Sequence, residues 1–502
     1  MPSNTDQTRL GTVVCLENDP NVMEFNFVVE GGPSEVLVRR GEFVGVPTDN
    51  GLVIARVQDL VGTNRYYQHA EAVREYQSRG ESLRTIFPTD RWQYTVAQAR
   101  VQGCWLEGRA ARPFFAVSPG AVVRKIEDDV LASFLRLQPE GGLRLGKLAH
   151  HELDFTPSLQ SLLSKHLAIL AMSGAGKSYF VSVLLEEIAS RGQGRLAVVV
   201  IDVHGEYSYL KRMTPADLGV AQGTFEVEHI RGPQFQIPVQ SLSADALGAL
   251  VSEMSSVQLR DLRRVVSSMR ESTKGGYTLG NIVDRVRDDE SISKNTKEAL
   301  MGWLVGLDDT GLFGKEASPE LKSIVKPGKL TLIDLSDFVS LKKKQIIVAY
   351  LAGELLSLRR QGKAPPFLLV LEEAHQFCPD SRHELALPKH QIETMAREGR
   401  KFFALLCLIS QRPVKLSTTV LSQCNTQAIF RTRNPYDLEH IGQSSEGIDK
   451  ASLDTITTLE VGEALFVGEA VSVPTFVKIR RRKYEPEGLE VSLEDALRKA
   501  DK

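Results

Sequence analysis

The stretch that decides the fold lies between residues 171 and 178 and reads Ala171-Met172-Ser173-Gly174-Ala175-Gly176-Lys177-Ser178. The sequence predicts an apolar strand over 166–170 before it and a helix over 179–189 after it. Small residues let successive backbone N–H groups curl around a phosphate, and the start of the helix adds its positive end. In such a loop the lysine reaches the outer phosphates and the serine hydroxyl ligates Mg²⁺. The stretch therefore predicts binding of a nucleoside triphosphate.

Seven consecutive residues are the expected nucleotide contacts: Ser173, Gly174, Ala175, Gly176, Lys177, Ser178 and Tyr179. Ala171 stands where loops of this kind usually have their first glycine. An alanine is tolerated there if its φ is negative, because only a positive φ calls for glycine.

A pair of carboxylates, Glu372 and Glu373, follows an apolar run over 367–371. Such a run predicts a buried strand, and acids at its carboxyl end lie beside the phosphate loop of a parallel sheet. We assign Glu372 to the Mg²⁺ shell and Glu373 to activation of the attacking water. The alternative is a pair of acids that begins an exposed helix.

A third acidic group follows the apolar run 197–201. Asp202 and Glu206 are candidates to ligate Mg²⁺ or to orient its water shell, and we include Asp202 among the metal residues. Their individual roles stay open. His204, between them, is interpreted as a hydrogen-bonded structural residue.

Basic and polar residues surround a further predicted strand, over 404–409. Gln411, at its carboxyl end, is the candidate for sensing the γ-phosphate. Arg397 and Arg400 precede the strand, and either is a candidate to stabilise the charge that develops in phosphoryl transfer, in the same chain or from a neighbouring subunit. The alternative is a solvated basic helix end.

Strands that alternate with helices from about residue 143 onward predict a doubly wound α/β sheet. The predicted domains are a β-barrel over 1–142, an α/β core over 143–214 and 327–484, a helical insertion over 215–326 and a tail over 485–502. Short β-branched runs punctuated by Gly, Pro and Asp-Asn-Gly turns indicate the barrel, with one polar helix near 68–82.

Two clusters of basic residues have more than one interpretation. The arginines of the insertion (Arg260, Arg263, Arg264 and Arg270) suit a solvated helix face or a DNA-facing one. The densest basic run is Lys478 with 480–483. It suits a charged edge strand, a contact between subunits or neutralisation of nucleic-acid phosphates.

Composition bounds the class of protein. The 502 residues contain 61 Lys and Arg against 63 Asp and Glu, a net charge of −2, which excludes a uniformly basic nucleic-acid coat. No run of about 18 apolar residues is present, and five scattered cysteines form no CxxC pair. We expect a multidomain, cytoplasmic protein that does not enter a membrane.

Taken together and in this order, the motifs resemble the HerA branch of the FtsK-like P-loop ATPases. They are the phosphate loop, Asp202-Val203-His204-Gly205-Glu206-Tyr207, Glu372-Glu373-Ala374-His375, Arg397-Glu398-Gly399-Arg400-Lys401 and Ser410-Gln411-Arg412-Pro413. The resemblance implies a RecA-like ATPase core behind an N-terminal barrel. It carries over Lys177, Ser178, Glu372 and Glu373 as the site within one chain, with Arg397 or Arg400 as the arginine finger.

The resemblance also implies partners and cofactors. HerA-like proteins hydrolyse ATP with Mg²⁺ as homo-hexameric rings, translocate on double-stranded DNA through the ring channel, and dock a NurA-type nuclease on the barrel for DNA-end processing. Many have a basic residue before the phosphate-loop strand, and the resemblance implies that Lys165, which stands there in this chain, assists nucleotide contact. Their C-terminal strand and tail pack on a neighbouring subunit, the role implied for residues 464–467 and the residues C-terminal to them.

A second hypothesis remains open at this stage. HerA-like ATPases of mesophiles also stand beside other effector enzymes in antiviral defence, so the ring is then a scaffold that assembles and activates an effector. A nucleotide kinase is disfavoured, because the acidic strand lies far beyond the phosphate loop and no acceptor site is recognisable.

Overall fold

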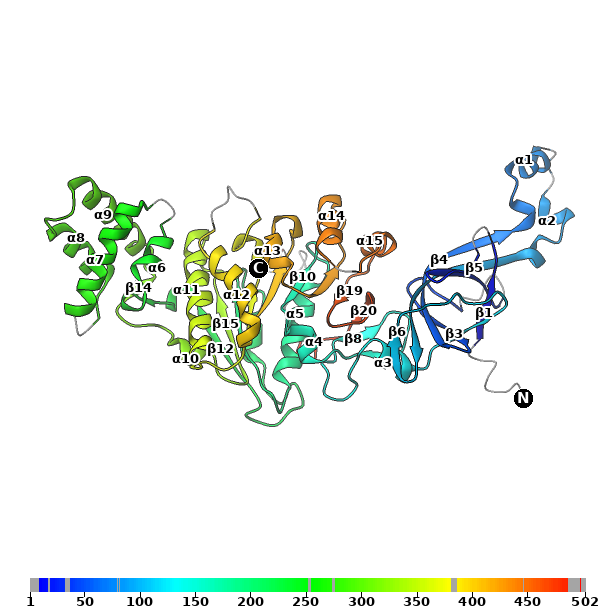
Figure 1. Ribbon diagram of the computed structural model, residues 1–502, viewed down its shortest axis with the longest axis horizontal. Coiled ribbons are helices and arrows are strands. Elements are labelled where there is room, and N and C mark those ends of the chain that lie inside the picture. Colours follow the sequence, from blue (N-terminus) through cyan, green and yellow to red (C-terminus); the bar gives the residue numbers. More distant parts are fainter. Residues whose placement is uncertain are drawn as a thin grey trace. The chain divides into compact units, whose positions relative to one another are not determined.

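The computed structural model describes residues 9–485 apart from 17–18, 32–36, 79, 81, 252–253, 273–275, 381–385 and 446, together with residue 497. The predicted tail therefore lies almost entirely outside the described residues. The chain forms two compact units, whose helices and strands are labelled in Figure 1. The first unit comprises 1–158, 449–452 and 470–478, and the second comprises the remainder.

The first unit contains the predicted β-barrel. Its strands are β1 (Arg9–Val14), β2 (Glu24–Val29), β3 (Phe43–Thr48), β4 (Gly51–Asn64), β5 (Gln93–Leu106), β6 (Arg109–Ala111) and β7 (Val122–Lys125). The order β2-β1-β7-β3-β4-β5 closes because β2 also pairs with β5, and β6 extends from β5. Alternating residues such as Phe25 and Phe27 fill the interior. Closure of the barrel pairs the backbone N–H and C=O groups that the edge strands of an open sheet would leave exposed.

A long hairpin leaves this barrel. β4 and β5 both continue past it, and between them lie η1 (Arg65–Tyr67), α1 (Ala70–Ser78), α2 (Leu83–Ile86) and η2 (Thr89–Trp92). The predicted polar helix near 68–82 is α1. The first unit also contains α3 (Asp128–Phe134), β8 (Gly146–Leu148), β9 (Asp154–Phe155) and most of β20 (Thr475–Ile479).

A buried cation ties the barrel to distant parts of the sequence. Arg56 on β4 is 3% exposed. Its guanidinium donates to Ser452 Oγ at 2.8 Å and to the Pro474 carbonyl at 2.9 Å, and it lies 3.7 Å from Asp449 Oδ2. The guanidinium also stacks on the ring of Phe476, 5.5 Å from its centre. Short C-terminal pieces of the chain are thus structural parts of the first unit.

The second unit is built on a mostly parallel sheet. Its strands are β10 (Leu167–Leu170), β11 (Ala197–Asp202), β12 (Glu226–Arg231), β15 (Lys329–Asp334), β16 (Phe367–Leu371), β17 (Ala404–Ser410), β18 (Thr426–Phe430) and β19 (Glu463–Gly468). The order is β12-β15-β11-β16-β17-β10-β18-β19, with only β19 antiparallel to its neighbour in this set. The central strands are buried throughout, which explains their apolar runs without alternation.

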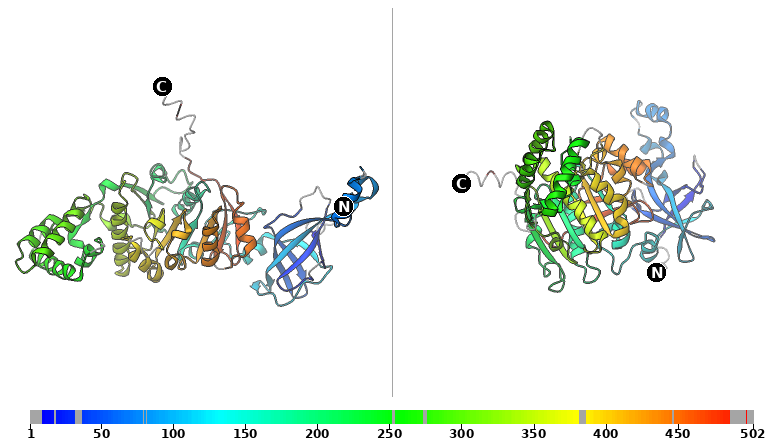
Figure 2. Two further views of the ribbon diagram at one scale, coloured as in Figure 1. Left: turned by 90° about the horizontal axis from the view of Figure 1, so that it is seen from above. Right: turned by 60° about the vertical axis from the view of Figure 1, so that its left-hand side comes forward.

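Helices cover this sheet, as Figure 2 shows. They are α4 (Leu159–Leu163), α5 (Lys177–Ala189), α11 (Leu341–Arg360), α12 (Lys389–Glu398), α13 (Thr418–Leu421) and α14 (Pro435–Ser444). Helix α15 (Lys450–Ile456) begins in the first unit and ends in the second. The chain passes from β10 through α5 to β11 in one direction along the sheet, and through α11 and α12 in the other. Right-handed crossovers therefore place α5 on the face opposite α11 and α12. The α/β fold predicted from the sequence is confirmed.

The predicted insertion contains α6 (Ala244–Ala249), α7 (Ser256–Ser272), α8 (Leu279–Asp288) and α9 (Lys294–Asp308). It also contains β12, the edge strand of the main sheet, and the short elements β13 (Ile237–Pro238), β14 (Phe313–Gly314) and α10 (Leu321–Ile324). Arg263 pairs with Asp245, and Arg264 with Asp289 at 3.1 Å. These two arginines are therefore used within the helical bundle.

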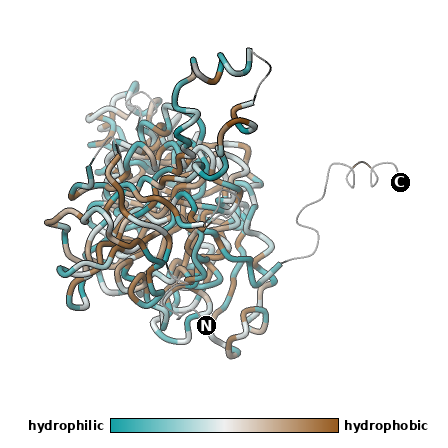
Figure 3. Tube along the Cα trace, turned by 90° about the vertical axis from the view of Figure 1, so that its right-hand side faces the viewer, coloured by the Kyte–Doolittle hydropathy of each residue, from teal (hydrophilic) through white to brown (hydrophobic). Residues whose placement is uncertain are grey.

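Hydrophobic and hydrophilic stretches alternate along the trace of the chain (Figure 3). Within the ranges that the structure describes, no helix combines the length and the apolar content needed to cross a bilayer.

One buried histidine makes the second unit sensitive to acid. His166 precedes β10, 1% exposed, and its Nδ1 accepts from Leu406 N–H while its Nε2 donates to the Ala396 carbonyl, both at 3.0 Å. Burial lowers the pKa of His166 to about 4. Between pH ~6.5, the ordinary histidine pKa, and pH ~4, the unfolded chain binds a proton at this histidine and the folded chain does not. The free energy of unfolding therefore keeps the full contribution of His166 above this pH range and decreases as the pH falls through it.

We expect wild-type protein to lose up to ~3 kcal/mol across this window on account of His166. His166→Gln should be less stable than wild type at pH 7.5, because a hydrogen-bonded buried ring is lost, and the difference should narrow at pH 5. Urea-denaturation midpoints at both pH values measure this. His69→Gln, at an exposed position, is the control. A difference that is the same at both pH values contradicts the assignment.

Candidate active site

The polar residues singled out in the sequence gather at one edge of the parallel sheet. Leu170 on β10 lies opposite Ser410 on β17, Ile201 on β11 lies opposite Leu371 on β16, and Asp202 lies opposite Asp334. The carboxyl ends of the strands thus meet, and the loops that follow them approach one another. This edge is where open α/β sheets bind their ligands.

The phosphate loop has the backbone that the sequence predicted. Gly174 and Gly176 have φ of +73° and +100°, which glycine adopts without strain. A Cβ on Gly176 would lie 3.1 Å from the backbone nitrogen of Gly462, so the turn before β19 also requires glycine here. Ala171 is fully buried and is not among the residues with positive φ. The alanine therefore replaces the usual glycine without strain.

Lys177 lies within reach of three carboxylates at this edge. Its side chain is 6% exposed, and its Nζ lies 3.5 Å from Glu372 Oε1, 3.8 Å from Glu373 Oε1 and 3.7 Å from Glu206 Oε2. A buried ammonium needs partners of opposite charge, because burial disfavours its charged form. The two predicted glutamates and the predicted lysine are thus brought together.

Glu372 and Glu373 differ in how they are held. Glu372 is fully buried, and its Oε2 accepts from Val203 N–H at 3.1 Å. Glu373 has the left-handed φ of +49°, rare for a residue with a side chain. Its Oε2 lies 3.3 Å from His375 Nδ1. In both glutamates, Oε1 is buried without a hydrogen-bond partner within the described chain.

Burial raises the pKa of both carboxyls above that of an ordinary glutamate. The charges of Asp202 and Glu206 raise that of Glu372 further, whereas Lys177 opposes the shift in both. A carboxylate with a raised pKa is a better proton acceptor. Gln411 lowers the pKa of Glu373, so the predicted sensor lies near this carboxyl.

Asp202, predicted as a metal residue, accepts three hydrogen bonds from the loop that follows it. Its Oδ1 accepts from the N–H groups of Gly205 and Glu206, at 2.7 and 3.0 Å, and its Oδ2 accepts from Tyr207 N–H at 2.8 Å. Both oxygens therefore stabilise the loop that follows β11. We interpret Asp202 as the residue that shapes this loop, and Glu206, whose Oε2 accepts from Ser178 Oγ, as the carboxylate that the loop presents.

Sequence reasoning missed Lys344 as a neighbour of this site. It lies on α11, its Nζ donates to the Val203 carbonyl at 3.0 Å, and burial lowers its pKa. Val203 N–H binds Glu372, so the two contacts hold one residue's backbone from both sides. The only signal in the sequence was a run of three lysines, 342–344, which is typical of an exposed helix start.

Three predicted residues lie at the other edge of the sheet. Arg397 lies in the last turn of α12, Arg400 lies in η7 (Gly399–Phe402) before β17, and both are exposed. Lys165 precedes β10, and its Nζ pairs with Glu469. Seven residues of β17 separate the two edges, about 20 Å. The structure thus does not bring these three residues to the phosphate loop of their own chain.

Tyr179, predicted to contact the nucleotide, lies in the first turn of α5 and contacts Arg482 in the C-terminal part of the second unit. Its hydroxyl accepts from Arg482 N–H at 2.8 Å. Its contact with Arg482 was not predicted.

The donor set fits Mg²⁺. Hydroxyl and carboxylate oxygens are the ligands this ion prefers, and it commonly keeps several waters and binds through one or two carboxylates. Ser178 Oγ and Glu372 Oε1, which lacks a hydrogen-bond partner, are the oxygens we assign to it. No group of three or more His, Cys, Asp or Glu side chains forms a complete metal cage among the described residues. When bound, the ion would neutralise phosphate charge.

This arrangement suits phosphoryl transfer to water. Backbone N–H groups of the loop and Lys177 can bind phosphate oxygens, and Glu373, with Gln411 near it, can accept a proton from water. Fold and site define a P-loop ATPase. Similar proteins of known name indicate which group of P-loop ATPases this chain resembles.

Residues 143–355 match the family described as "Helicase HerA, central domain". The DNA double-strand break repair helicase HerA of Pyrococcus furiosus is 28% identical, covering 88% of this chain and 87% of that protein. HerA of Sulfurisphaera tokodaii is also 28% identical, covering 79% and 80%. A probable helicase of Methanocaldococcus jannaschii is 26% identical, covering 92% and 89%. The chain resembles the HerA helicases over most of its length, as its motifs predicted.

One solved structure supports the fold. VirB4 of Thermoanaerobacter pseudethanolicus superposes with a TM-score of 0.51 at 15% identity, covering 72% of this chain and 99% of that one.

We expect Glu373→Gln to lower ATP turnover by at least ~100-fold while nucleotide affinity changes less than about threefold, because the proton acceptor is lost but Lys177 and the loop remain. Steady-state hydrolysis and titration with a fluorescent ATP analogue measure the two quantities. Glu439→Gln, at an exposed position on α14, is the matched control. Normal turnover in Glu373→Gln moves the water-activating role to another residue.

Proposed function

We propose that this protein is an ATP-driven motor that moves on double-stranded DNA, with Mg²⁺ bound at the phosphate loop. The observation that carries the proposal is the grouping of Lys177 with Glu372 and Glu373 at the phosphate loop, in a chain whose relatives named as DNA-repair helicases align with most of its length. Net charge is near zero, so DNA binding would depend on basic groups gathered in one place, such as a ring channel.

We propose further that the motor is a homo-hexamer with ATP sites shared between subunits. Arg397 and Arg400 are exposed, about a strand's length from their own phosphate loop. An arginine in this position can stabilise phosphoryl transfer only at a neighbour's site. Such a residue contributes ~10³–10⁵ in rate where it has been measured in other NTPases.

The hairpin of the first unit is the surface we propose for an effector enzyme, a NurA-type nuclease in the first instance. Tyr67, Ile86 and Trp92 are each more than 40% exposed. Exposed apolar side chains gathered on one segment are typical of protein contact sites. An effector of antiviral defence would use the same surface, and the DNA dependence of ATP hydrolysis separates the two proposals.

Linear double-stranded DNA should stimulate ATP hydrolysis by the purified chain at least about fivefold, because a motor couples turnover to its track. The Lys177→Ala variant measures the background rate of ATP hydrolysis, because it lacks the ammonium group that would contact the phosphates. Measurable hydrolysis that does not respond to DNA favours the scaffold hypothesis.

Mixing tests the shared site. Arg400→Ala and Lys177→Ala subunits, each inactive alone, should regain part of the wild-type ATPase activity when mixed, because some interfaces then combine an intact loop with an intact arginine. Arg397→Ala is tested in the same way to identify which arginine acts. Mixed rings, confirmed by mass, that stay inactive with both variants contradict the proposal.

A further inference from the structure

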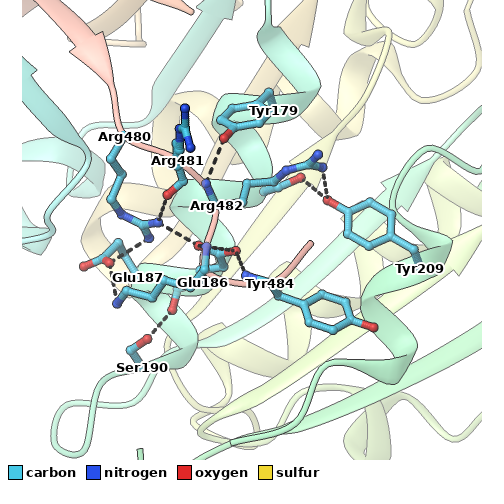
Figure 4. A network of polar contacts seen from close by, with 11 residues as sticks. Tyr179, Glu186, Glu187, Ser190, Tyr209, Arg480, Arg481, Arg482 and Tyr484 are labelled. Atoms are coloured by element: carbon cyan, nitrogen blue, oxygen red, sulfur yellow. Dashed lines mark hydrogen bonds and ion pairs between the residues drawn. The ribbon is translucent and has the colours of Figure 1, made fainter. Parts of the chain in front are cut away.

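The densest basic run of the sequence is docked on the phosphate-loop helix of its own chain. The segment Arg480–Tyr484, here called the strap, follows β20 and lies along α5 (Figure 4). Sequence reasoning offered an edge strand, a subunit contact or a DNA contact for this run. The strap instead makes its contacts within the second unit.

Two acidic residues of α5 receive the strap. Glu186 is fully buried and Glu187 is 8% exposed. Arg480 joins them, with Nη1 2.9 Å from Glu186 Oε2 and Nη2 2.8 Å from Glu187 Oε1. The N–H groups of Lys483 and Tyr484 donate to Glu186 Oε1, both at 2.9 Å. Buried carboxylates need such partners. The two glutamates of α5 therefore favour binding of the strap.

Arg482 makes a second kind of contact. Its guanidinium lies over the ring of Tyr179, 4.5 Å from the ring centre, and 5.6 Å from that of Tyr209. Its Nη1 donates to Tyr209 Oη at 3.0 Å, and its backbone N–H donates to Tyr179 Oη at 2.8 Å. Tyr209 also stacks on Tyr484, with 6.2 Å between ring centres. Arg482 thus joins two parts of the unit.

Both of these parts lead to Ser178. Tyr179 is its neighbour in the chain. Tyr209 Oη lies 2.6 Å from Ser182 Oγ, which donates to the Ser178 carbonyl at 2.8 Å. Tyr209 lies in η3 (Ser208–Arg212), directly after the loop that presents Glu206 to Ser178 Oγ. A short series of hydrogen bonds therefore connects Arg482 with the serine assigned to Mg²⁺.

We propose that Arg482 is a positioning residue for ATP hydrolysis, which acts by holding Ser178 and the Glu206 loop in the geometry that receives Mg·ATP. This inference rests on ATP turnover at the phosphate loop and not on translocation along DNA. Because coupling between two sites is reciprocal, bound nucleotide should stabilise the docked strap by the same factor by which the strap strengthens binding.

The variant that tests this is Arg482→Ala, since it leaves Arg480 paired with Glu186 and Glu187. We expect KM for Mg·ATP to rise at least about tenfold while kcat changes less than about threefold. Arg482→Lys should recover part of the loss, because an ammonium also binds over an aromatic ring but lacks the planar fork. Arg481→Ala is the matched control, because that side chain is exposed and its neighbour on each side is a strap contact.

Hydrogen exchange supplies the readout that a purely structural role would not move. The amides of Arg482, Lys483 and Tyr484 donate to α5 side chains, so their exchange reports docking. Mg·ATPγS should slow their exchange at least about fivefold in wild type and in Arg481→Ala, and less than about twofold in Arg482→Ala.

The outcomes separate the inference from the proposed function. If Mg·ATPγS does not change the hydrogen exchange of the strap in wild type, the inference is wrong. It is also wrong if Arg482→Ala has an unchanged KM for Mg·ATP and a normal melting temperature. A wild-type protein with no DNA-stimulated turnover overturns the motor, but the binding-linked exchange still decides the role of Arg482.

Discussion

The contact of Lys177 with Glu206, Glu372 and Glu373 is the interaction on which the rest of the site depends. One buried ammonium lies near three carboxyl groups, and burial raises the pKa of two of them, Glu372 and Glu373. Burying charges this way costs free energy that is offset only by close pairing and by further hydrogen bonds. The sheet meets that requirement, because it brings the ends of β10, β11 and β16 together. A bound Mg²⁺ ion would add positive charge beside these carboxyl groups.

The surrounding structure is a set of supports for these few groups. Asp202 uses both oxygens to shape the Glu206 loop, Lys344 and Glu372 hold the Val203 backbone from opposite sides, and the strap holds the first turns of α5. None of these contacts contributes an atom to phosphoryl transfer. They come from four separate stretches of the chain, which is typical of sites whose reactive groups must be preorganised before the substrate arrives.

The sequence predicted the local features well and the long-range contacts poorly. The phosphate loop, the apolar strand before Glu372 and the helical spacing of α7 each follow from residues close together in the chain. The hydrogen bonds of Asp202 to its own loop were not predicted, because a carboxylate at a strand end looks the same in the sequence whether it faces a ligand or its own loop. Lys344 and Arg482 contact partners that are more than a hundred residues away in the sequence. Patterns of spacing carry no information about such pairs.

The cation Arg56 has a consequence for how this protein can be divided. Its partners at 449, 452, 474 and 476 are separated from the barrel, along the sequence, by most of the ATPase sheet. A truncation at the end of the barrel sequence would leave a buried guanidinium without a counter-charge in one fragment and orphaned Asp449 in the other. Exchange of barrels between relatives, by recombination or by design, must therefore transfer two short C-terminal pieces as well. The barrel unit is contiguous in space but is built from separate parts of the sequence, so it cannot be exchanged as one continuous segment.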